Sequence, residues 1–474
     1  LLLEKLDYTK GTSSKSTKLI HGGVRYMAQG DLKMVREALK ERGYLLRNAP
    51  HLVHDQPFII PNYRWWEGAF YTIGLKFYDM LAGKFSMGRS IHLGKKKVIA
   101  HLEGVDPKGL RGGVLYHDGQ FDDSRLAMDL LHVFTNNSGI AMNYMGVTAL
   151  LKDENGKLSG VIAIDSETGE EFEFRGKAIL NAAGVWVDDI HRMDEPGHEN
   201  TIRPSQGVHV VLKKEFLPGD HALMIPKTSD GRVLFAVPWH DHLVVGTTDT
   251  PIDHSDAEPQ ALEEEIDFIL RTASSYLARE VTRKDVLTVF AGLRPLAAPK
   301  QGDSKTKEIS RNHKIIVSVS GLTTVIGGKW TTYRRMAQDM IDTAIKNGML
   351  QASPSISSTY KLAKITDNDF RMYGSNADAI AELSKKEPGM TDRIHPDLPY
   401  TWAEVEWLAV NEQVVHLEDL LARRLRALLL NARATKEIAG TVCDRVGPVL
   451  GWDKKRCKEE TATFELLADR YILN

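Results

Sequence analysis

LLLEKLDYTKGTSSKSTKLIHGGVRY, residues 1–26, is the stretch that decides the fold. Its first residues are apolar and end in Glu4, which predicts a short buried strand that finishes on an acid. The turn at residues 10–14 offers several helix N-caps, so we predict a helix from about Ser13 to the pair Gly22 and Gly23. A dinucleotide-binding fold uses an acid at a strand end to hold a ribose hydroxyl. Glu4 is in the right place for that role, although a lone acid there is more often a solvated carboxylate.

The glycine-rich loop of such a fold does not occur in this sequence. A Rossmann unit places its first strand and a GxGxxG loop ahead of the acid, over roughly 25 to 30 residues. The sequence starts at Leu1, so we expect that segment to precede it in a longer functional protein. A chain that began at Leu1 would bind a dinucleotide weakly, because the loop supplies the main site for the pyrophosphate.

The rest of the first 350 residues alternates strands and helices, as an α/β enzyme does. Apolar and polar residues alternate around a turn at residues 152–157, which predicts a β-hairpin or meander. We predict a helix over residues 31–48, a buried strand over 178–184, a strand-rich region over 201–250 and a strand over 314–320 that leads through Gly327 and Gly328 into a helix.

An aromatic stretch runs from Tyr63 to Phe85 and includes Trp65 and Trp66. The plainer interpretation is a buried helix and its rim. The alternative is a peripheral membrane contact, because Trp and Tyr favour interfaces and the stretch also carries Arg64, Lys76 and Lys84. Both interpretations stay open on the sequence alone.

The character of the sequence changes after Gly348. A Ser- and Pro-containing linker at residues 353–358 precedes a tail that is helical in pattern, so we predict a domain boundary near residue 352. Residues 404–430 show apolar residues at helical spacing with Arg423, Arg424 and Arg426 between them, which predicts a helix packed on one face.

Charge and cysteine content exclude several functional classes. The 474 residues carry 61 basic and 63 acidic side chains, a net charge of −2, so no global field gathers nucleic acid and any anion site must be local. Cys443 and Cys457 lack zinc or redox spacing, and His240 and His242 at a hairpin tip lack a third ligand, so we predict no metal site. No apolar run reaches the length of a membrane-spanning helix.

Three cations stand beside glycines: Arg25 after Gly22 and Gly23, Arg294 after Gly292, and Lys329 after Gly327 and Gly328. Each one singly is more often a solvated or ion-paired residue. Together, and with His209 in the strand-rich region, they favour a pocket for a phosphorylated substrate, because glycine lets a ligand approach the backbone closely.

Residues 11–26, GTSSKSTKLIHGGVRY, closely resemble the FAD-dependent glycerol-3-phosphate dehydrogenases. Further blocks follow in the order that this family uses: residues 181–186 NAAGVW, 246–249 GTTD, 291–296 AGLRPL, 310–311 SR, 327–333 GGKWTTY, 395–400 HPDLPY, 403–405 AEV, 422–424 ARR and 451–452 GW. Several blocks in one order are far more specific than any single block.

The resemblance implies an α/β (α+β) fold, in which an FAD-binding Rossmann-like domain is interleaved with an antiparallel-sheet substrate domain and followed by an all-helical domain. We expect a core over residues 1–352 and the helical domain over 353–474. Within the core, the FAD part is expected at about 1–55, 110–190 and 310–350, and the substrate part at about 56–109 and 191–309.

The resemblance also implies the activity: oxidation of sn-glycerol 3-phosphate to dihydroxyacetone phosphate, with hydride transfer to N5 of FAD and electrons passed to quinone. It places His209, Arg294 and Lys329 in catalysis and Arg25, Tyr26 and Arg311 on the substrate. We expect His209 to be the general base, because a histidine pKa lies near neutrality. The implied FAD-binding residues are Glu4, Thr12, Ser13, Ser14, Ser16, Gly22, Gly23, Val147, Ala183, Gly184, Trp186, Gly328, Lys329, Trp330 and Thr331.

Two rival functions remain at this point: an oxygen-dependent glycerol-3-phosphate oxidase, and a catalytically silent binding or scaffold protein if the chain truly starts at Leu1. For the enzyme we expect the quinone pool and a membrane surface as partners, no nucleic acid, and a homodimer as one form. The expected location is the cytoplasm, peripherally on the inner face of the cytoplasmic membrane, or the mitochondrial inner membrane in a eukaryote.

Overall fold

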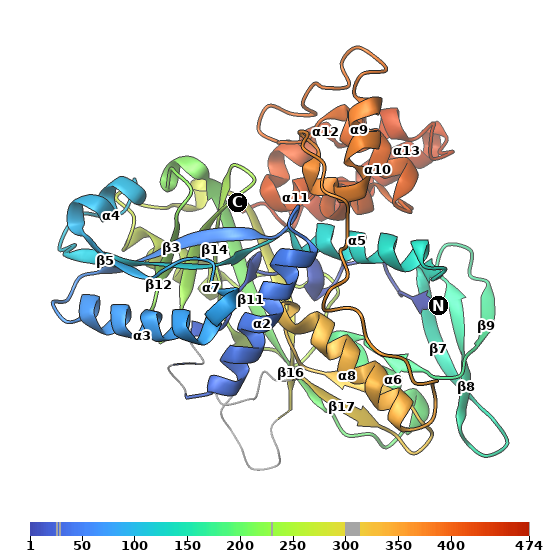
Figure 1. Ribbon diagram of the computed structural model, residues 1–474. Helices are drawn as coiled ribbons and strands as arrows, with labels where there is room; N and C mark the ends of the chain where they lie inside the picture. The colour runs from blue at the N-terminus through green and yellow to red at the C-terminus, as the bar shows by residue number, and fades with distance from the viewer. Residues whose placement is uncertain (25–26, 28–29, 229–230, 299–312, 474) are drawn as a thin grey trace.

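The computed structural model describes residues 1–24, 27, 30–228, 231–298 and 313–473, and its centre is a large, mostly antiparallel sheet (Figure 1). The strand order is β15-β11-β14-β13-β12-β3-β5-β2, with β16 also paired to β11 and β4 to β5. The strands are β2 (Leu19–Ile20), β3 (His54–Asn62), β4 (Ile91–Gly94), β5 (Gly112–Gln120), β11 (Ile202–Lys213), β12 (Ala222–Ile225), β13 (Leu234–Trp239), β14 (His242–Gly246), β15 (Thr250–Pro251) and β16 (Val286–Ala297).

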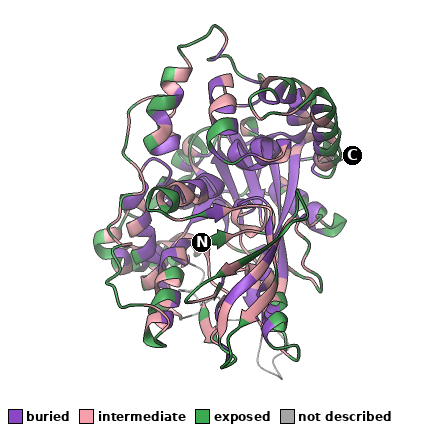
Figure 2. Cartoon of the chain, turned by 90° about the vertical axis from the view of Figure 1, so that its right-hand side faces the viewer, coloured by how far each residue is buried: buried purple, intermediate pink, exposed green. Residues whose placement is uncertain are grey.

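Three small sheets accompany it: the parallel pair β1 (Leu2–Leu3) and β6 (Ala141–Met142); the meander β7 (Met145–Lys152), β8 (Leu158–Asp165) and β9 (Glu171–Arg175); and the set β10 (Leu180–Asn181), β18 (Thr323–Ile326) and β17 (Lys314–Val317). The meander is the one that the alternating pattern predicts. In Figure 2 buried residues concentrate in the central sheet and the inner faces of the helices, whereas the meander is more exposed.

The core helices are α2 (Leu32–Asn48), α3 (Glu67–Ala82), α4 (Lys95–His101), α5 (Asp123–Asn136), α6 (Val187–Asp194), α7 (Glu263–Ser274) and α8 (Tyr333–Lys346). The tail contributes α9 (Ala377–Leu383), α10 (Trp402–Asn411), α11 (Ala427–Leu430), α12 (Ala432–Val446) and α13 (Lys454–Asp469). Short 3₁₀ helices are η1 (Thr12–Ser14), η2 (Gly83–Phe85), η3 (Gly184–Trp186), η4 (Lys214–Phe216), η5 (Arg283–Asp285), η7 (Trp330–Thr332) and η8 (Arg371–Asn376).

The tail packs on the central sheet at strands β11, β13, β14 and β16. Its buried residues share one hydrophobic cluster with Val211, Trp239, Val244 and Phe290 of the sheet. The fold class is therefore confirmed: an α/β core whose C-terminal part is helical. The residue boundaries that we predict for the domains stay predictions; the central sheet itself draws β2 and β5 from the expected FAD part and its other strands from the expected substrate part.

The helix predicted from Ser13 to Gly22 is wrong. The chain makes only η1 there and then enters β2, which pairs with β5. Lys18 has a φ of 63°, outside the helical region, and its buried ammonium donates to both carboxylate oxygens of Asp123 at 2.9 Å. This long-range ion pair outweighs the local helix signal. The predicted strand β1 does form, but Leu2 is more exposed than a buried strand requires.

Two further expectations change. The aromatic stretch does form a helix, α3, but its outer face is open: Ile73 is 72% exposed, and Trp65, just before the helix, is 84% exposed. The single helix predicted over residues 404–430 is wrong too, because α10 ends at Asn411 and a separate wide turn, residues Asp419–Arg424, follows. Arg423 and Arg424 are fully buried in that turn.

None of the helices in the described part of the chain combines the length and apolarity that a bilayer crossing requires.

Candidate active site

A cavity of about 190 Å³ lies where η1, β11, β16 and η7 meet. Its lining residues come from four short segments. The first, between residues 12 and 21, contributes Thr12, Lys15, Ser16, Thr17, Leu19 and His21; the others contribute Gly207 and His209, residues 292–296, and residues 327–331. The three catalytic residues that we predict, His209, Arg294 and Lys329, all line it. Segments nearly 300 residues apart in sequence therefore converge on one hollow.

His209 lies on β11 with its imidazole buried against the cavity wall. Its Nε2 is 2.9 Å from the hydroxyl of Thr17, and its ring stacks on Phe290 across the strand pair at 4.9 Å. Burial, with the positive charges of Arg294 and Lys18, holds the pKa of His209 well below its ordinary value. The imidazole is therefore neutral at physiological pH and able to accept a proton.

Arg294 lies on β16, beside the same end of β11. Its guanidinium donates to the carbonyl oxygens of Gln206 at 3.2 Å and Thr248 at 3.0 Å, and contacts Asp249 at 3.3 Å. A Cβ on Gly207 would lie 2.3 Å from Nη2 of Arg294, so a larger residue there would displace the guanidinium from this position.

The glycine pair after β18 turns the chain into η7 and α8. Gly327 and Gly328 have φ values of 73° and 93°, which other residues rarely adopt. Lys329 follows, and its Nζ lies 3.1 Å from Sδ of Met34. Within the described part of the chain no side chain caps the start of η7, so backbone N–H groups at the cavity wall remain available to an electron-rich ligand.

The loop around η1 forms the opposite wall. The hydroxyl of Thr12 donates to the carbonyl of Leu293, and the indole Nε1 of Trp330 donates to the carbonyl of Ser13 at 2.9 Å. Ser16 donates to Asp123 through both its backbone N–H and its hydroxyl. The start of η1 also has no side-chain cap among the described residues. The described residues leave two helix starts without side-chain caps at the cavity, and the turn at Gly327 and Gly328 adjoins it; backbone N–H groups there suit the electron-rich edge of a flavin ring.

Other predicted cofactor residues lie outside the cavity lining. Ala183, Gly184 and Trp186 form η3 and its entry, and the ring of Trp186 lies 3.5 Å from the position of a Cβ on Gly11. Glu4 follows β1, and Val147 lies on β7. Ser14 offers its carbonyl to Lys18. Burial raises the pKa of the Glu4 carboxyl.

Three of the predicted substrate residues, Arg25, Tyr26 and Arg311, lie outside the described residues. The glycines before Arg25 are well placed in the structure: Gly22 is packed against Tyr78 and Leu39, and Gly23 has a φ of 80°.

Sequence reasoning missed several residues of the site. Thr17 and His21 line the cavity, and Lys15, whose ammonium contacts Glu258, forms part of its floor. Lys18 and Asp123 lie directly behind the loop as a fully buried ion pair. Thr17 and His21 stand inside the quoted block, so their position between the dinucleotide loop and the glycine pair was the available signal.

Comparison with known proteins agrees with this geometry. Residues 1–334 match the family described as FAD dependent oxidoreductase, and residues 323–457 match the C-terminal domain of alpha-glycerophosphate oxidase. The mitochondrial glycerol-3-phosphate dehydrogenase of Bos taurus is 38% identical over 98% of this chain and 68% of its own length. The mitochondrial enzyme of Arabidopsis thaliana is 37% identical over 97% of this chain and 80% of its own length.

Solved structures show the same fold. The glycerol-3-phosphate dehydrogenase from Bacillus halodurans, complexed with FAD, has a TM-score of 0.78 at 24% identity and covers 100% of this chain and 90% of its own. The L-alpha-glycerophosphate oxidase from Mycoplasma pneumoniae has a TM-score of 0.57 at 18% identity, over 77% and 92% of the two chains. The family match and the sequence identity to the dehydrogenases show that this chain belongs to the FAD-dependent glycerol-3-phosphate dehydrogenases.

Proposed function

We propose that this protein oxidises sn-glycerol 3-phosphate to dihydroxyacetone phosphate at the cavity between β11, β16 and η7. One observation carries the proposal: a neutral buried histidine and two cations, Arg294 near Gly292 on β16 and Lys329 after the turn at Gly327 and Gly328, converge on one hollow. A secondary alcohol that bears a phosphate needs this combination of a base and fixed positive charge.

The cations of the cavity serve the charged parts of the substrate. Arg294 carries a permanent charge and presents several N–H donors, so it suits the phosphate or the alkoxide that develops at C2. Lys329 lies across the cavity on the glycine turn, which supports a role close to the flavin ring. Arg25, Tyr26 and Arg311 complete the proposed substrate set by resemblance to the family.

His209 is the proposed base. The proton of the C2 hydroxyl passes to its imidazole while the hydrogen on C2 leaves with both electrons of its bond. In the free protein the low pKa makes His209 a weak base, because burial and then the charges of Arg294 and Lys18 disfavour the protonated imidazole. A bound phosphate dianion offsets those charges and raises the basicity of the imidazole when substrate is present. Substrate binding and base strength are coupled in this way.

FAD supplies the hydride acceptor, N5 of its isoalloxazine ring. Within the chain, the residues that would hold it are the loop at Thr12–Ser14, Ser16, the glycine turn before Lys329, and Trp330 with Thr331. Glu4, Val147, Ala183, Gly184 and Trp186 are proposed for the adenosine side, in keeping with their place outside the cavity.

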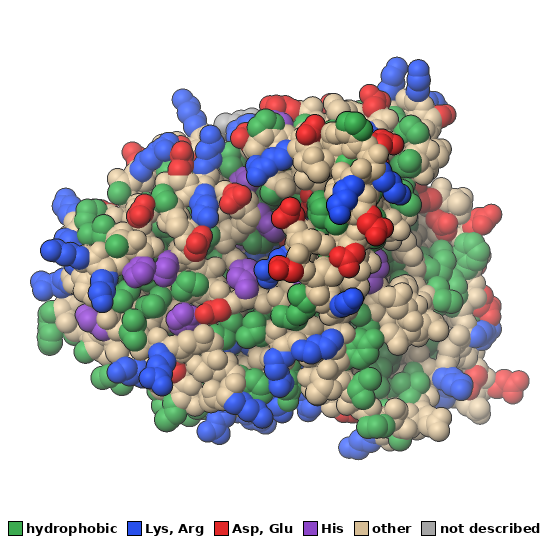
Figure 3. Space-filling model, turned by 45° about the horizontal axis from the view of Figure 1, so that its top comes forward, with side chains coloured by type: hydrophobic (Ala, Val, Ile, Leu, Met, Phe, Trp, Pro, Cys, Tyr) green, Lys and Arg blue, Asp and Glu red, His purple; other side chains and the backbone are tan. Residues whose placement is uncertain are grey.

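We propose quinone as the electron acceptor and an anionic membrane surface as the place where it is met. The outer face of α3 carries exposed Phe70, Ile73 and Met80, and exposed Trp65 lies just before the helix; water solvates this set poorly. Cations border it at Arg64, Lys76 and Lys84, in an arrangement that suits lipid headgroups. In Figure 3 hydrophobic and basic side chains lie interspersed over the end of the molecule that carries α3 and α4 in Figure 1.

The proposed location follows from this surface: the inner mitochondrial membrane in a eukaryote or the cytoplasmic membrane in a bacterium. Co-sedimentation with vesicles of phosphatidylcholine and phosphatidylglycerol tests it. We expect binding that Trp65→Ser with Ile73→Ser abolishes. Equal binding by this double variant would contradict the role of α3.

The experiment for the reaction is an anaerobic absorbance titration of the purified protein with its FAD bound. We expect sn-glycerol 3-phosphate to bleach the flavin bands and glycerol, which lacks the phosphate, to leave them unchanged. Flavin bands that persist at high glycerol 3-phosphate would contradict the proposed reaction. Reoxidation of the bleached flavin by a soluble quinone faster than by oxygen would separate the dehydrogenase from the oxidase alternative.

A further inference from the structure

Asp118 on β5 is a buried carboxylate outside the cavity whose hydrogen bonds converge from several elements. The residue is 2% exposed. Its Oδ1 accepts from the backbone N–H of Gly22 at 3.1 Å and from Nη1 of Arg42 at 2.7 Å, and its Oδ2 accepts from the hydroxyl of Tyr78 at 2.9 Å. Arg42 belongs to α2 and Tyr78 to α3. One side chain therefore connects two helices, a central strand and the loop after β2.

The hydrogen bond from the Gly22 amide to Asp118 links this carboxylate to the cavity. Gly22 follows His21, which lines the cavity, and precedes Gly23, whose φ of 80° turns the chain. A Cβ on Gly22 would lie 2.2 Å from the hydroxyl of Tyr78 and 2.4 Å from Cδ2 of Leu39. The backbone of the loop therefore rests directly on Tyr78, and its amide is held by Asp118.

The charge of Asp118 has a partner that explains its burial. Arg42 is 1% exposed and also donates to the carbonyl of Phe85 at 3.1 Å. Asp118 in turn raises the pKa of the Tyr78 hydroxyl, second to burial, so that the tyrosine stays a donor. The ion pair with Arg42 and the hydrogen bond from Tyr78 fix the Asp118 carboxylate from two sides, and this holds the acceptor of the Gly22 amide in one position.

We propose that Asp118, with Tyr78, is a positioning residue that sets the place of His21 at the substrate cavity through the amide of Gly22. The inference rests on the proposed function, because the cavity is taken as the substrate site. It assigns Asp118 no contact with substrate or cofactor. Loss of the Tyr78 hydroxyl lets the loop shift, and substrate binding weakens while the chemistry of bound substrate remains.

The test compares Tyr78→Phe with Tyr116→Phe. Both tyrosines are fully buried, and each variant loses one hydroxyl hydrogen bond: Tyr78 donates to Asp118, whereas Tyr116 donates to Sδ of Met224 at 3.0 Å. We expect Tyr78→Phe to lower kcat/KM for glycerol 3-phosphate about fivefold relative to Tyr116→Phe, with the loss carried by KM. Equal kcat/KM in the two variants, or a loss in kcat at unchanged KM, would overturn the proposal.

A double variant and a hydrogen-exchange measurement test the same proposal independently. Asp118→Leu with Arg42→Met removes both charges together, so no buried ion is left unpaired, and should raise KM more than Tyr78→Phe does. Hydrogen exchange at the amide of Gly22 is expected to accelerate in Tyr78→Phe and not in Tyr116→Phe, and unchanged exchange contradicts the proposal whatever the activity. A wild-type protein that leaves glycerol 3-phosphate unoxidised would instead refute the proposed function.

Discussion

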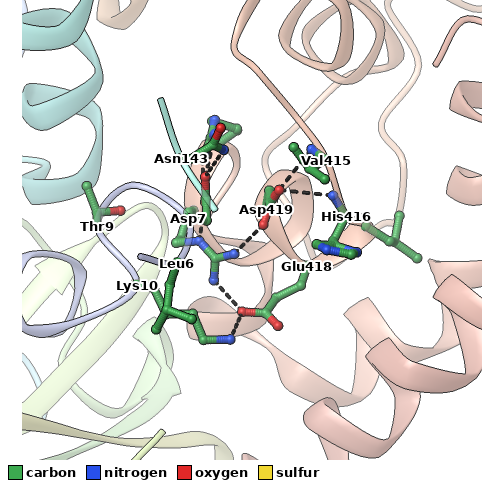
Figure 4. Close-up of polar contacts among 12 residues, drawn as sticks. Leu6, Asp7, Thr9, Lys10, Asn143, Val415, His416, Glu418 and Asp419 are labelled. Carbon is green, nitrogen blue, oxygen red and sulfur yellow. Dashed lines mark hydrogen bonds and ion pairs between the residues drawn. The ribbon is translucent and has the colours of Figure 1, made fainter. Parts of the chain in front are cut away.

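Arginines occupy two very different places in this molecule. At the junction of the N-terminal segment and the helical tail they are buried and matched to carboxylates: Arg423 contacts Asp7, Glu418 and Asp419, and Arg424 donates to both oxygens of Asp7. Figure 4 shows the three carboxylates of this junction, Asp7, Glu418 and Asp419, close together. At the cavity Arg294 is 23% exposed and bonds mostly carbonyl and hydroxyl oxygens in the described part of the chain.

The difference lies in how much of the positive charge remains for a ligand. Asp7 sits between two guanidinium groups, which hold the pKa of its carboxyl well below the usual range against the opposing effect of burial. The charges of these buried arginines are neutralised by carboxylates of the protein itself, so the ion pairs stabilise the fold. The cavity cations stand beside glycines and an open volume, so part of their charge is directed at whatever enters.

Breaking the junction should give the largest effect. Asp7→Asn removes the shared anion and leaves Arg424 buried with carbonyl partners, so we expect the free energy of unfolding to fall by about 3–5 kcal/mol. Urea denaturation monitored by circular dichroism measures this. Asp189→Asn, which removes a solvent-exposed partner of Arg192, is the control and should change stability by less than about 0.5 kcal/mol. Similar small losses in both variants would refute the structural role of the junction.

Arg294→Met tests the other side of the comparison. We expect kcat/KM for glycerol 3-phosphate to fall about 100- to 1000-fold, because the variant removes a fixed charge beside the reacting atoms. Thermal unfolding should change little, since the side chain is only partly buried. Arg271→Met, on the exposed side of α7, should leave kcat/KM unchanged. A stability loss in Arg294→Met as large as that of Asp7→Asn would place Arg294 with the structural arginines.

Gly292→Ala probes the contact between the cavity strand and the FAD loop. A Cβ there would lie 2.8 Å from Cβ and 2.9 Å from the carbonyl oxygen of Lys15, so the loop backbone must shift. We expect the affinity for FAD to fall about tenfold, measured by flavin fluorescence during titration of the apoprotein. Gly197→Ala, where nothing lies within 4 Å of the added atom, serves as the control. An unchanged affinity in Gly292→Ala would mean that the loop tolerates displacement.

The smallest predicted effect concerns pH and again belongs to the junction. Burial lowers the pKa of His416, but Glu460 and, more weakly, Glu167 outweigh it and raise the pKa to about 9. A pKa raised on folding gives stability that is complete below about 6.5 and is lost as pH rises through about 9. Wild type should therefore exceed His416→Gln by about 1 kcal/mol at pH 6 and by almost nothing at pH 10. A constant difference across this range would contradict the charge of His416.

Local sequence signals predicted residues of the cavity but not the buried ion pairs around it. Arg294, Lys329 and His209 were predictable because glycines adjoin the cations and a strand-rich pattern surrounds the histidine. The pairs Lys18 with Asp123 and Arg424 with Asp7 join residues 105 and 417 positions apart, and neither partner has a local signature. Such pairs also caused the errors: Lys18 is drawn out of the predicted helix, and Arg423 and Arg424 lie in a buried turn rather than on a solvated helix face.

The outer face of α3 shows another limit of the sequence. Its aromatic residues have the helical spacing of a core helix, and composition alone does not distinguish a buried face from an exposed one. The outcome depends on which side of α3 packs on the core: Tyr78 and Leu75 are buried, whereas Ile73 on the same helix is exposed.

Stopped-flow reduction of the bound flavin by glycerol 3-phosphate in His209→Gln tests the account most directly. If the cavity is the active site and His209 its base, the rate of flavin reduction should fall by at least about 100-fold, while FAD content and the unfolding transition stay close to wild type. A near-normal rate of reduction in this variant would contradict the assignment of the base and, with it, the chemistry proposed for the cavity.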